Sequence, residues 1–322
     1  MCEKNVQVTI IVLVFNPKNT LTDCIATIYA QSEKNVQIIL VDECSSDRSL
    51  EICKESAKND NRIEIYIQDK NKGQSAVRNV GIVHAKEKYL YFRDTDDRMT
   101  LNCIEFLKRN ISEDNIDMAV YDYYIDEQEV HEKNKTPARL SAYQIAYMIA
   151  GSNKYQAKGY LWNKLFKHTL ISSWVMFDEE LFIYEDTLLC QQYVQHCNII
   201  SYDAVPKYNY ISQFSSAMRG RIGSQNLSTV HGYNKIVECR KRYNDNELIH
   251  ILEANKMVHY YTLIVKVLKN YNKEQERYDK VICGFIEEDI KKIINNKYFP
   301  MKQKLVCILN MAYFKVLRAI SK

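Results

Sequence analysis

Three carboxylates follow an apolar run in this sequence, and their types and spacing suggest metal chemistry. Residues 89–92 are aromatic and apolar and predict a buried strand, whereas Asp94, Asp96 and Asp97 cannot be buried without a partner. A strand that ends in a cleft containing a positive charge would meet both requirements. Mg²⁺ and Mn²⁺ are hard cations that commonly bind one or two carboxylates together with substrate phosphates. A solvated turn is the alternative, because Asp is frequent in turns.

The elements that must position these carboxylates alternate between strand and helix over the first 122 residues. Continuous apolar runs predict strands at residues 8–15, 36–41, 63–68, 89–92 and 118–121. A helix that begins at Asn19 or Thr20 would present one apolar stripe, made of Leu21, Cys24, Ile25 and Ile28. Another helix is expected over residues 76–85. This alternation predicts βαβ units around a mostly parallel sheet with flanking helices.

A second acidic pair is expected at the same edge of that sheet. Asp42 and Glu43 follow the second strand, as residues 94–97 follow the fourth. Ligands of such sheets bind beyond the carboxyl ends of the strands, at a topological switch point. The two acidic clusters together therefore favour a metal–nucleotide site over two unrelated turns.

Composition limits the class of protein and its organisation. A chain of 322 residues with 46% hydrophobic and 26% charged residues can form one large soluble domain or two. The net charge of +4 is too small to indicate nucleic acid as a partner. The ten cysteines form no Cys-x-x-Cys pair, and no signal peptide or apolar run of about 20 residues is recognisable, so a cytoplasmic location is expected. The pattern becomes nearly all helical from about residue 224, which predicts a first domain over 1–222 and a helical region over 223–322.

Several segments, in order, resemble family 2 glycosyltransferases. They are residues 8–16, 38–47 (IILVDECSSD), 71–79 (NKGQSAVRN) and 94–97 (DTDD), followed by 161–166 (LWNKLF) and 177–186. The likeness extends over roughly residues 6 to 215. It implies a GT-A fold, a nucleoside-diphosphate sugar as donor, Mn²⁺ or Mg²⁺ as cofactor, and inversion at the anomeric carbon.

The resemblance also implies roles for the donor-side residues. Asp94 and Asp96 fill the family's Asp-x-Asp positions, in which Asp94 would contact the ribose or sugar and Asp96 the metal. A metal would neutralise the charge that develops on the leaving nucleoside diphosphate. Arg78 fills the basic position near the donor, where its fixed charge suits a phosphate or a carboxylate. An ion pair on a helix surface is the alternative for Arg78.

The nucleoside end of the predicted site departs slightly from the family pattern. Asp42 and Glu43 fill the acidic pair that contacts the nucleoside, but the second position is usually Asp. The additional methylene of Glu43 leaves the nucleotide preference open, and a solvated loop residue is its alternative. Phe15 and Asn16 stand where the family usually has Tyr-Asn, so Phe15 could stack on the base or pack in the core.

Glu185 and Asp186 are the predicted catalytic residues. Direct displacement by an acceptor hydroxyl needs a carboxylate opposite the leaving group, which takes the proton as the attack proceeds. The resemblance assigns this base to Asp186, with Glu185 orienting it or the acceptor. The same acids would also favour the dipole of an apolar helix over residues 188–194.

Three further residues have less specific patterns. Trp162 could stack on a sugar or nucleoside ring, or belong to an aromatic core. Lys164 and Arg219 could contact the pyrophosphate or an anionic acceptor, or be surface charges. The family's histidine after the base, which completes the metal shell, is not identifiable.

Residues 301–322 contain five basic residues and no acidic one. Their apolar residues fall along one helical face, at Leu305, Ile308, Leu309, Ala312, Val316 and Ile320. Such a helix can lie in a membrane interface beside anionic lipids, as a peripheral contact at the inner face of the cell membrane. Packing on its own domain, or on a second copy in a homo-oligomer, is the alternative.

The sequence therefore predicts a metal-dependent inverting glycosyltransferase. Its acceptor would be a hydroxyl of a bacterial surface glycan, free or lipid-linked, a prediction that follows from the family alone. The alternatives are a catalytically inactive GT-A-fold protein that binds glycan or nucleotide, and a nucleotidyltransferase. The latter usually needs a Gly-rich phosphate loop with a basic residue, and residues 16–19 contain no glycine.

Overall fold

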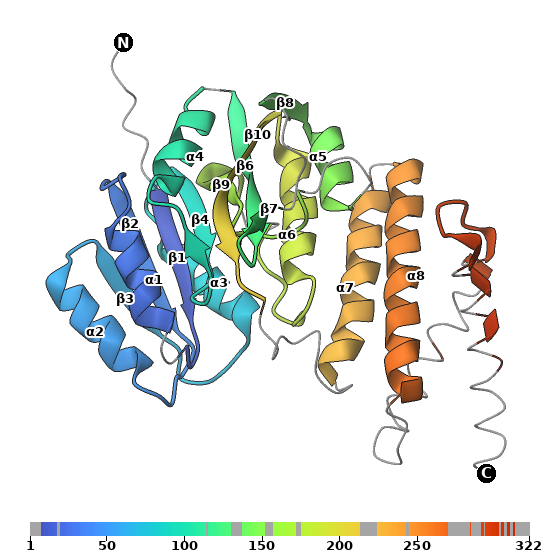
Figure 1. Cartoon of the computed structure of the whole chain (residues 1–322), viewed down its shortest axis with the longest axis horizontal. Coiled ribbons are helices and arrows are strands. Elements are labelled where there is room, and N and C mark those ends of the chain that lie inside the picture. Colours follow the sequence, from blue (N-terminus) through green and yellow to red (C-terminus); the bar gives the residue numbers. More distant parts are fainter. Residues whose placement is uncertain are drawn as a thin grey trace. The chain divides into compact units, whose positions relative to one another are not determined.

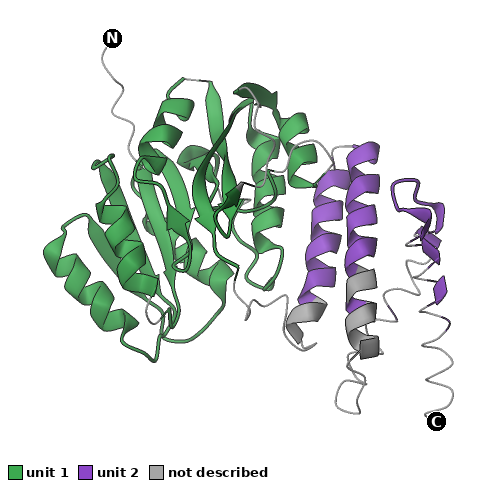
Figure 2. Ribbon diagram, in the orientation of Figure 1, with its two compact units in different colours: residues 1–213 green, residues 214–322 purple. Residues whose placement is uncertain are grey.

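The computed structural model forms two compact units, residues 1–213 and 214–322, which are described separately (Figure 2). The residues described are 8–17, 20–113, 115–129, 137–151, 157–171, 175–212, 224–242, 245–269 and scattered positions between 284 and 312. Residues 213–223, which include the expected boundary after residue 222, lie outside them. The two-domain division at that residue therefore stays a prediction.

The first unit is built on a mixed, mostly parallel central sheet (Figure 1). Its strands are β1 (Val8–Val14), β2 (Val36–Asp42), β3 (Ile63–Ile67), β4 (Tyr89–Arg93), β5 (Arg98–Met99), β6 (Ile116–Ile125), β7 (Gln128–Glu129), β8 (Ala138–Ser141), β9 (Lys164–Lys167) and β10 (Ile199–Tyr210). The strand order is β3-β2-β1-β4-β9-β6-β10-β5, with β7 beside β6 and β8 beside β10. Strands β1 to β4 are parallel, β6 and β10 are parallel, and the remaining pairs are antiparallel.

Helices cover both faces of the sheet. They are α1 (Thr20–Tyr29), α2 (Ser49–Asn59), α3 (Gln74–His84), α4 (Cys103–Ile111), α5 (Ala142–Ile149) and α6 (Glu185–Tyr193), with the 3-10 turns η1 (His168–Leu170) and η2 (Val194–His196). Helices α1, α2 and α4 pack into the main core on one face, whereas Val77 of α3 packs with Ile39 and Val41 on the other. The predicted stripe of α1 is the buried one, with Leu21, Cys24, Ile25 and Ile28 all inside.

The order in which the chain adds strands to the sheet reverses next to β1. Strands β2 and β3 extend the sheet from one side of β1, and β4 pairs with the other side. This reversal is the topological switch point at which ligands of open α/β sheets bind. The carboxyl ends of β1, β2 and β4 all open there, which confirms the predicted sheet class and brings the predicted motifs to one edge.

The sequence patterns did not predict β5 or the strands β7 to β10, and for β9 and β10 the composition shows why. β10 is 12 residues long but contains Pro206, and its pairing with β6 shifts register between Asp203 and Tyr208. Proline cannot donate to a ladder, so it is tolerated at such an irregularity and hides the strand pattern. β9 is flanked by Lys164 and Lys167, which concealed a strand whose first three residues are buried.

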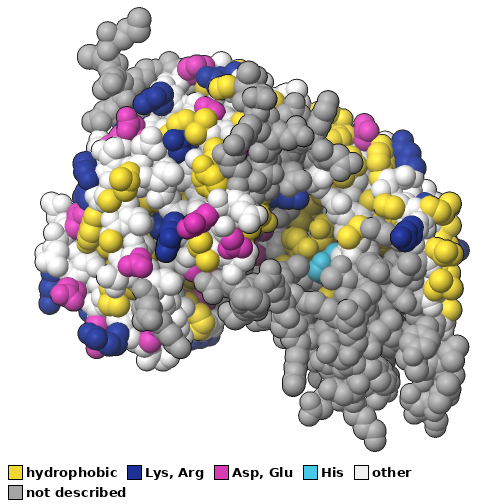
Figure 3. Space-filling view, in the orientation of Figure 1, with side chains coloured by type: hydrophobic (Ala, Val, Ile, Leu, Met, Phe, Trp, Pro, Cys, Tyr) yellow, Lys and Arg dark blue, Asp and Glu magenta, His cyan; other side chains and the backbone are white. Residues whose placement is uncertain are grey.

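The second unit is helical in its described part, as predicted. Helices α7 (Ser224–Lys241) and α8 (Asn246–Lys269) pack on each other, and Val230, Ile236, Leu248 and Leu252 are buried. None of the described helices combines the length and the apolar character that crossing a bilayer requires. On the face drawn in Figure 3, acidic and basic side chains are interspersed over the described residues of the first unit.

Candidate active site

The carboxylate loop, residues 94–97, begins where β4 ends. Its last residue, Asp97, is buried and holds the loop in place through hydrogen bonds. The Tyr208 hydroxyl donates to Asp97 Oδ2 at 3.0 Å, and the Ile211 amide donates to Oδ1 at 2.8 Å. Burial and the neighbouring Asp94 raise the pKa of Asp97 to about 8. Asp97 is thus turned into the protein and ties the loop to the end of β10.

Arg93, the last residue of β4, also stabilises the carboxylate loop. Its guanidinium is buried, donating from Nη2 to the Asp97 carbonyl at 3.1 Å and to Thr27 Oγ1 at 2.8 Å. Nε lies 3.1 Å from Cys24 Sγ. These contacts join the carboxylate loop to α1. The signal in the sequence was a charged residue at the end of an otherwise apolar strand, and no role was predicted for it.

Asp94 and Asp96 are the two carboxylates of the loop that remain accessible. The side chain of Asp94 is 38% exposed, and Asp96 is half-buried. Burial and the charge of Asp94 raise the pKa of Asp96 above its ordinary value. A dication would relieve this repulsion, so the pair fits Mg²⁺ or Mn²⁺, which needs few protein ligands when substrate phosphates supply the others. No cluster of three or more His, Cys, Asp or Glu side chains suited to a metal occurs among the described residues.

Helix α3 binds the segment before α6 through its polar side chains. Ser75 Oγ donates to the Leu181 carbonyl at 3.1 Å. The amide of Asn79 forms a two-way pair with the backbone of Phe177, at 2.9 and 3.0 Å. The predicted motif at residues 71–79 therefore holds the segment that leads to Glu185.

Arg78 of α3 connects the two predicted acidic sites. Its Nη1 donates to Glu185 Oε1 at 2.7 Å, and its Nη2 lies 3.5 Å from Asp94 Oδ1. The guanidinium also lies over the Phe177 ring, 5.4 Å from its centroid. Although burial opposes its charge, Glu185 and Asp94 keep the pKa of Arg78 above its usual value. Arg78 is buried, so the exposed ion pair considered for it is not what forms.

The acidic pair Glu185 and Asp186 begins α6. Tyr184 precedes it with a φ of 69°, which turns the chain into the helix. Glu185 is buried and accepts from Gln74 as well as from Arg78; burial and Asp186 raise the pKa of Glu185 to about 7. Asp186 is half-buried, and its Oδ1 accepts from the Thr187 amide at 2.6 Å. Burial raises the pKa of Asp186, an effect that Arg78 opposes.

A tight loop over residues 157–161 packs against the start of α6. Lys164 is fully buried, and its ammonium donates to the carbonyls of Ala157, Lys158 and Tyr160 at 2.6–2.9 Å. Burial lowers the pKa of Lys164 to about 8. Lys164 is therefore not a surface charge, and its ammonium is taken up by this loop. Arg219 lies outside the described residues.

The predicted nucleoside residues lie at the ends of β1 and β2. Asp42 Oδ2 accepts from the Ser45 amide at 3.1 Å, while the buried Oδ1 has no partner in the described structure. Such an orphaned acceptor fits a donor N–H or O–H of a ligand. Glu43 is buried and accepts from the amide of Gly73, at the start of α3. Burial raises the pKa of Glu43. Glu43 is therefore not a solvated loop residue, which was the alternative.

Phe15 and Asn16 differ in what they do at this edge. Phe15 is 43% exposed, so its ring is free of the core and available for stacking. Asn16 has a φ of 47°, and its Oδ1 accepts from the Ser46 amide at 2.9 Å. Asn16 thus shapes the loop after β2. Trp162, in contrast, is buried with the rings of Tyr160 and Tyr208 stacked on it, 4.8 and 4.6 Å away.

Comparison with known families identifies this arrangement. The model described as glycosyl transferase family 2 matches residues 9–183, which are 175 of the chain's 322 residues. The chain belongs to glycosyl transferase family 2. It is therefore a glycosyltransferase, as predicted. The family match includes the carboxylate loop and Arg78 and ends just before Glu185 and Asp186.

Several proteins similar to this chain come from bacteria. The glycosyltransferase GlyA of Streptococcus pneumoniae is 41% identical over 118 residues, 37% of this chain, but the match spans only 17% of GlyA. GlyG of the same organism is 28% identical over 201 residues, covering 58% of this chain and 67% of GlyG. The minor teichoic acid biosynthesis protein GgaA of Bacillus subtilis is 30% identical over 201 residues, 57% of this chain and 42% of GgaA.

Solved structures confirm the GT-A fold. Staphylococcus aureus TarS 1–349 in complex with UDP aligns with a TM-score of 0.70 at 16% identity, covering 98% of this chain and 92% of TarS. The mannosyltransferase PcManGT of Pyrobaculum calidifontis, in complex with GDP-Man and Mn²⁺, aligns with a TM-score of 0.53 at 10% identity. The latter alignment covers 98% of this chain and 87% of PcManGT.

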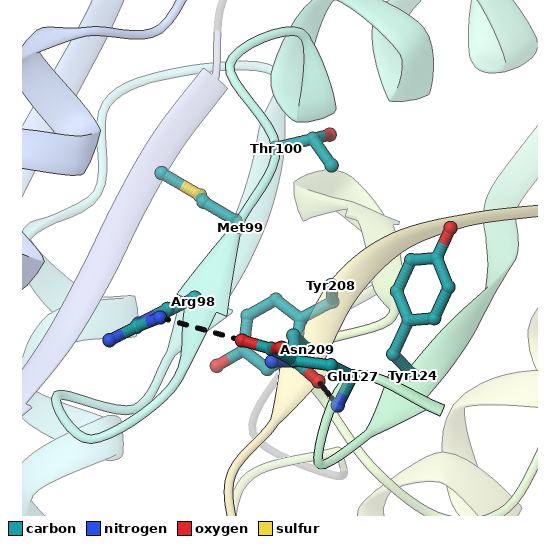
Figure 4. A pocket seen from close by; sticks show the side chains of 7 residues that line it. All are labelled: Arg98, Met99, Thr100, Tyr124, Glu127, Tyr208 and Asn209. Carbon is teal, nitrogen blue, oxygen red and sulfur yellow. Dashed lines mark hydrogen bonds and ion pairs between the residues drawn. The ribbon is translucent and has the colours of Figure 1, made fainter. Parts of the chain in front are cut away.

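A cavity of about 430 Å³ adjoins the carboxylate loop of this family 2 enzyme (Figure 4). Its lining residues are Arg98, Met99, Thr100, Tyr124, Glu127, Tyr208 and Asn209. Asn209 pairs with Arg98 on one side and with Tyr124 on the other, so these three side chains share one face of the sheet. Glu127 reaches over them, 3.8 Å from Arg98. Sequence reasoning missed this group because its members come from three separate strands and turns.

At Gly159 the loop over residues 157–161 approaches the residue after the predicted base so closely that a side chain has no room. A Cβ on Gly159 would lie 2.6 Å from Thr187 Cα, in the residue that follows Asp186. Gly159→Ala is expected to displace the start of α6 and to lower kcat about tenfold or more, because small misplacements of catalytic groups cost up to ~10²-fold. Gly284→Ala, where the added methyl meets nothing within 4 Å, is the matched control. Unchanged kcat in Gly159→Ala would show that α6 can shift without consequence.

The raised pKa of Glu185 predicts a pH dependence. If transfer requires the ionised pair, kcat should rise with pH up to about 7, the pKa of Glu185, and Glu185→Gln should remove that limb.

The stability of the fold should change with pH in the opposite sense to kcat. The folded-state pKa lies above the unfolded value of about 4.3, so this group's stabilising contribution is complete below pH ~4 and is lost as the pH rises towards 7. Thermal unfolding of the wild type and of Glu185→Gln from pH 4 to 8 measures this contribution to stability. Unfolding temperatures that change in parallel with pH in the two proteins would contradict the prediction.

Proposed function

We propose that this chain transfers a sugar from a nucleoside diphosphate to a hydroxyl of a bacterial surface glycan, with inversion and with a divalent metal. The observation that carries the proposal is the buried bridge through Arg78. One guanidinium contacts Asp94, on the predicted donor side, and Glu185, beside the predicted base. A site that must align a donor with an attacking hydroxyl needs such a fixed relation between its two halves.

The donor assignment is supported at the edge formed by β1 and β2. Asp42 offers an unpartnered buried oxygen and Phe15 an exposed ring, which suit the polar edge and the flat face of a nucleoside. Structures of TarS with UDP and with UDP-GlcNAc share this fold. We therefore expect a UDP-sugar to be the first donor to test.

The metal assignment rests on Asp96, with Asp94 beside it. PcManGT, which shares the fold, was solved with Mn²⁺. When bound, the ion would neutralise negative charge on the leaving diphosphate. The protein's own contribution is to hold the carboxylate loop in place. Asp97 accepts from the Ile211 amide just after β10, and Arg93 donates to Thr27 of α1.

The transfer step then depends on α6. Asp186 would take the proton of the acceptor hydroxyl as that oxygen attacks the anomeric carbon, and the bond to the diphosphate breaks on the opposite face. Glu185, held by Arg78 and Gln74, would orient Asp186 or the acceptor. Asp186 Oδ1 already accepts from Thr187, so Oδ2 is the oxygen expected to receive the proton.

The proposed acceptor is a glycan or a lipid-linked glycan. The lined cavity beside the carboxylate loop combines an aromatic ring with donor and acceptor groups, from Tyr124, Arg98 and Asn209. Sugars are recognised by this mixture of flat apolar and directional polar contacts. GgaA, a relative, is named as a minor teichoic acid biosynthesis protein.

A thermal-shift panel tests the donor and the metal together. UDP-, GDP-, dTDP- and CMP-sugars would be added with and without Mn²⁺, because a ligand specific for the native state raises the unfolding temperature. We expect one nucleotide class to shift the wild type with Mn²⁺, and Asp96→Ala to weaken that apparent affinity at least tenfold while leaving the unliganded unfolding temperature unchanged. An equal shift in Asp96→Ala would contradict the metal assignment. Binding without release or transfer of sugar would favour an inactive binding protein.

A further inference from the structure

The second unit exposes large apolar side chains that the fold leaves uncovered. Met301 is 78% exposed, and Leu305 and Leu309 are each 58% exposed. These three residues are spaced by four, and each of them, like Ile308, is helical. Residues four apart share one helix face, so the exposed side chains form one apolar stripe.

The stripe begins directly after a segment that is firmly attached to α8. Phe299 is buried, Asn296 Nδ2 donates to the His250 carbonyl at 2.9 Å, and the Tyr298 hydroxyl donates to Glu247 at 2.9 Å. The chain therefore buries one aromatic side chain against its own unit and then leaves the following apolar residues outside. Met301, Leu305 and Leu309 are thus not packed on the described part of their own unit.

Every charged residue from position 290 onward is basic, whereas three acidic residues, Glu287, Glu288 and Asp289, directly precede this stretch. Residues 290–322 contain eight Lys and Arg and no Asp or Glu. Among the described ones, Lys291, Lys297 and Lys302 are exposed. Lys304 folds back and donates to the Ile294 carbonyl at 2.8 Å. A polar face that carries only positive charge, next to an apolar face, is typical of helices that lie in the interface of anionic membranes.

We propose that Met301, Leu305, Ile308 and Leu309, with Lys291, Lys297 and Lys302, form a surface that binds anionic lipid bilayers. We call these residues the basic apolar surface. Its apolar side chains enter the interface while the lysines contact acidic headgroups. A second copy of the chain fits it less well, because two such surfaces would bring like charges together. The proposal is independent of the proposed transfer reaction, although a lipid-linked acceptor would then share a surface with the enzyme.

Co-sedimentation of the full chain with vesicles tests this surface. Vesicles of phosphatidylcholine with about one third phosphatidylglycerol would be compared with pure phosphatidylcholine, since anionic lipid attracts basic residues. We expect binding to the anionic vesicles only, weakened by 0.5 M NaCl. Leu305→Glu with Leu309→Glu, and separately Lys291→Glu with Lys302→Glu, should each lower the partition coefficient at least tenfold. The matched control, Lys54→Glu with Lys58→Glu on α2, makes the same charge change elsewhere and should retain binding.

Each contrary result overturns the proposal. Wild type that does not sediment with anionic vesicles, or a control variant that loses as much binding as the others, excludes the basic apolar surface as the lipid contact. Sedimentation velocity that reveals a dimer which Leu305→Glu with Leu309→Glu dissociates would assign the stripe to a second copy. The nucleotide thermal shift of the Leu variants should equal that of wild type, which separates failure of this proposal from failure of the donor assignment.

Discussion

Asp186→Asn is expected to lower kcat by roughly 10³-fold while UDP binding changes less than about twofold, because general bases contribute ~10²–10⁴-fold. Asn keeps the shape of the side chain and an oxygen that can accept from Thr187, as Asp186 Oδ1 does at 2.6 Å. What it loses is the ability to take a proton. Single-turnover transfer measures the chemical step, and calorimetry with UDP and Mn²⁺ measures donor binding.

The control for Asp186→Asn is Glu180→Gln, which removes a carboxylate from an exposed position in the segment before α6. It should leave both measurements at the wild-type values. If Asp186→Asn retained the wild-type rate, Asp186 would not be the base, and Glu185 would be the next carboxylate to test. If instead UDP binding were lost, the residue would act on the donor.

Features that depend only on neighbouring residues in the chain could be predicted from the sequence. Apolar runs that end in carboxylates predicted both the strands β2 and β4 and the edge at which Asp42 and Asp94 emerge. In a parallel sheet this follows directly, because strand direction determines which ends share an edge. The α1 stripe was predicted residue by residue for the same reason: helical periodicity is a local property.

Contacts between distant segments were beyond the reach of local patterns. Arg78 and Glu185 are 107 positions apart, and their ion pair requires α3 and α6 to meet. Lys164 has the appearance of a surface charge until three carbonyls of one loop converge on it. Trp162 is aromatic in either role, and only the placement of Tyr208 on the neighbouring part of the sheet shows where its ring packs. Each outcome depends on a partner that the local pattern does not name.

Those long-range contacts also explain why the polar groups are costly to remove one at a time. Glu185 is buried and has two donors, Arg78 and Gln74, each at 2.7 Å. Breaking one member of a buried ionic group leaves the other charge uncompensated, whereas removing both can be nearly neutral. The bridge can therefore be dissected by single and double variants, which separate its contribution to stability from its contribution to transfer.

Arg78→Met is expected to destabilise the fold by about 3–5 kcal/mol, the usual cost of leaving a buried charge without its partner. The pKa of Glu185, which burial and Asp186 already raise to about 7, should rise further once the guanidinium is gone. The destabilisation should therefore be greatest above pH 7 and smaller at pH 5, where Glu185 is protonated. Urea unfolding at the two pH values measures this difference.

The double variant Arg78→Met with Glu185→Gln separates the two consequences of losing the bridge. It should recover most of the lost stability, because no buried carboxylate is left unpaired, yet its kcat should remain at least ~10²-fold below wild type, since positioning of the two halves is worth that much. Arg78→Lys keeps the charge but cannot reach Asp94 and Glu185 with separate nitrogens, and should be intermediate in both respects. Recovery of transfer in the double variant would show that the bridge only balances charge. Continued loss of transfer in a stable protein would show that Arg78 aligns the donor side with the base.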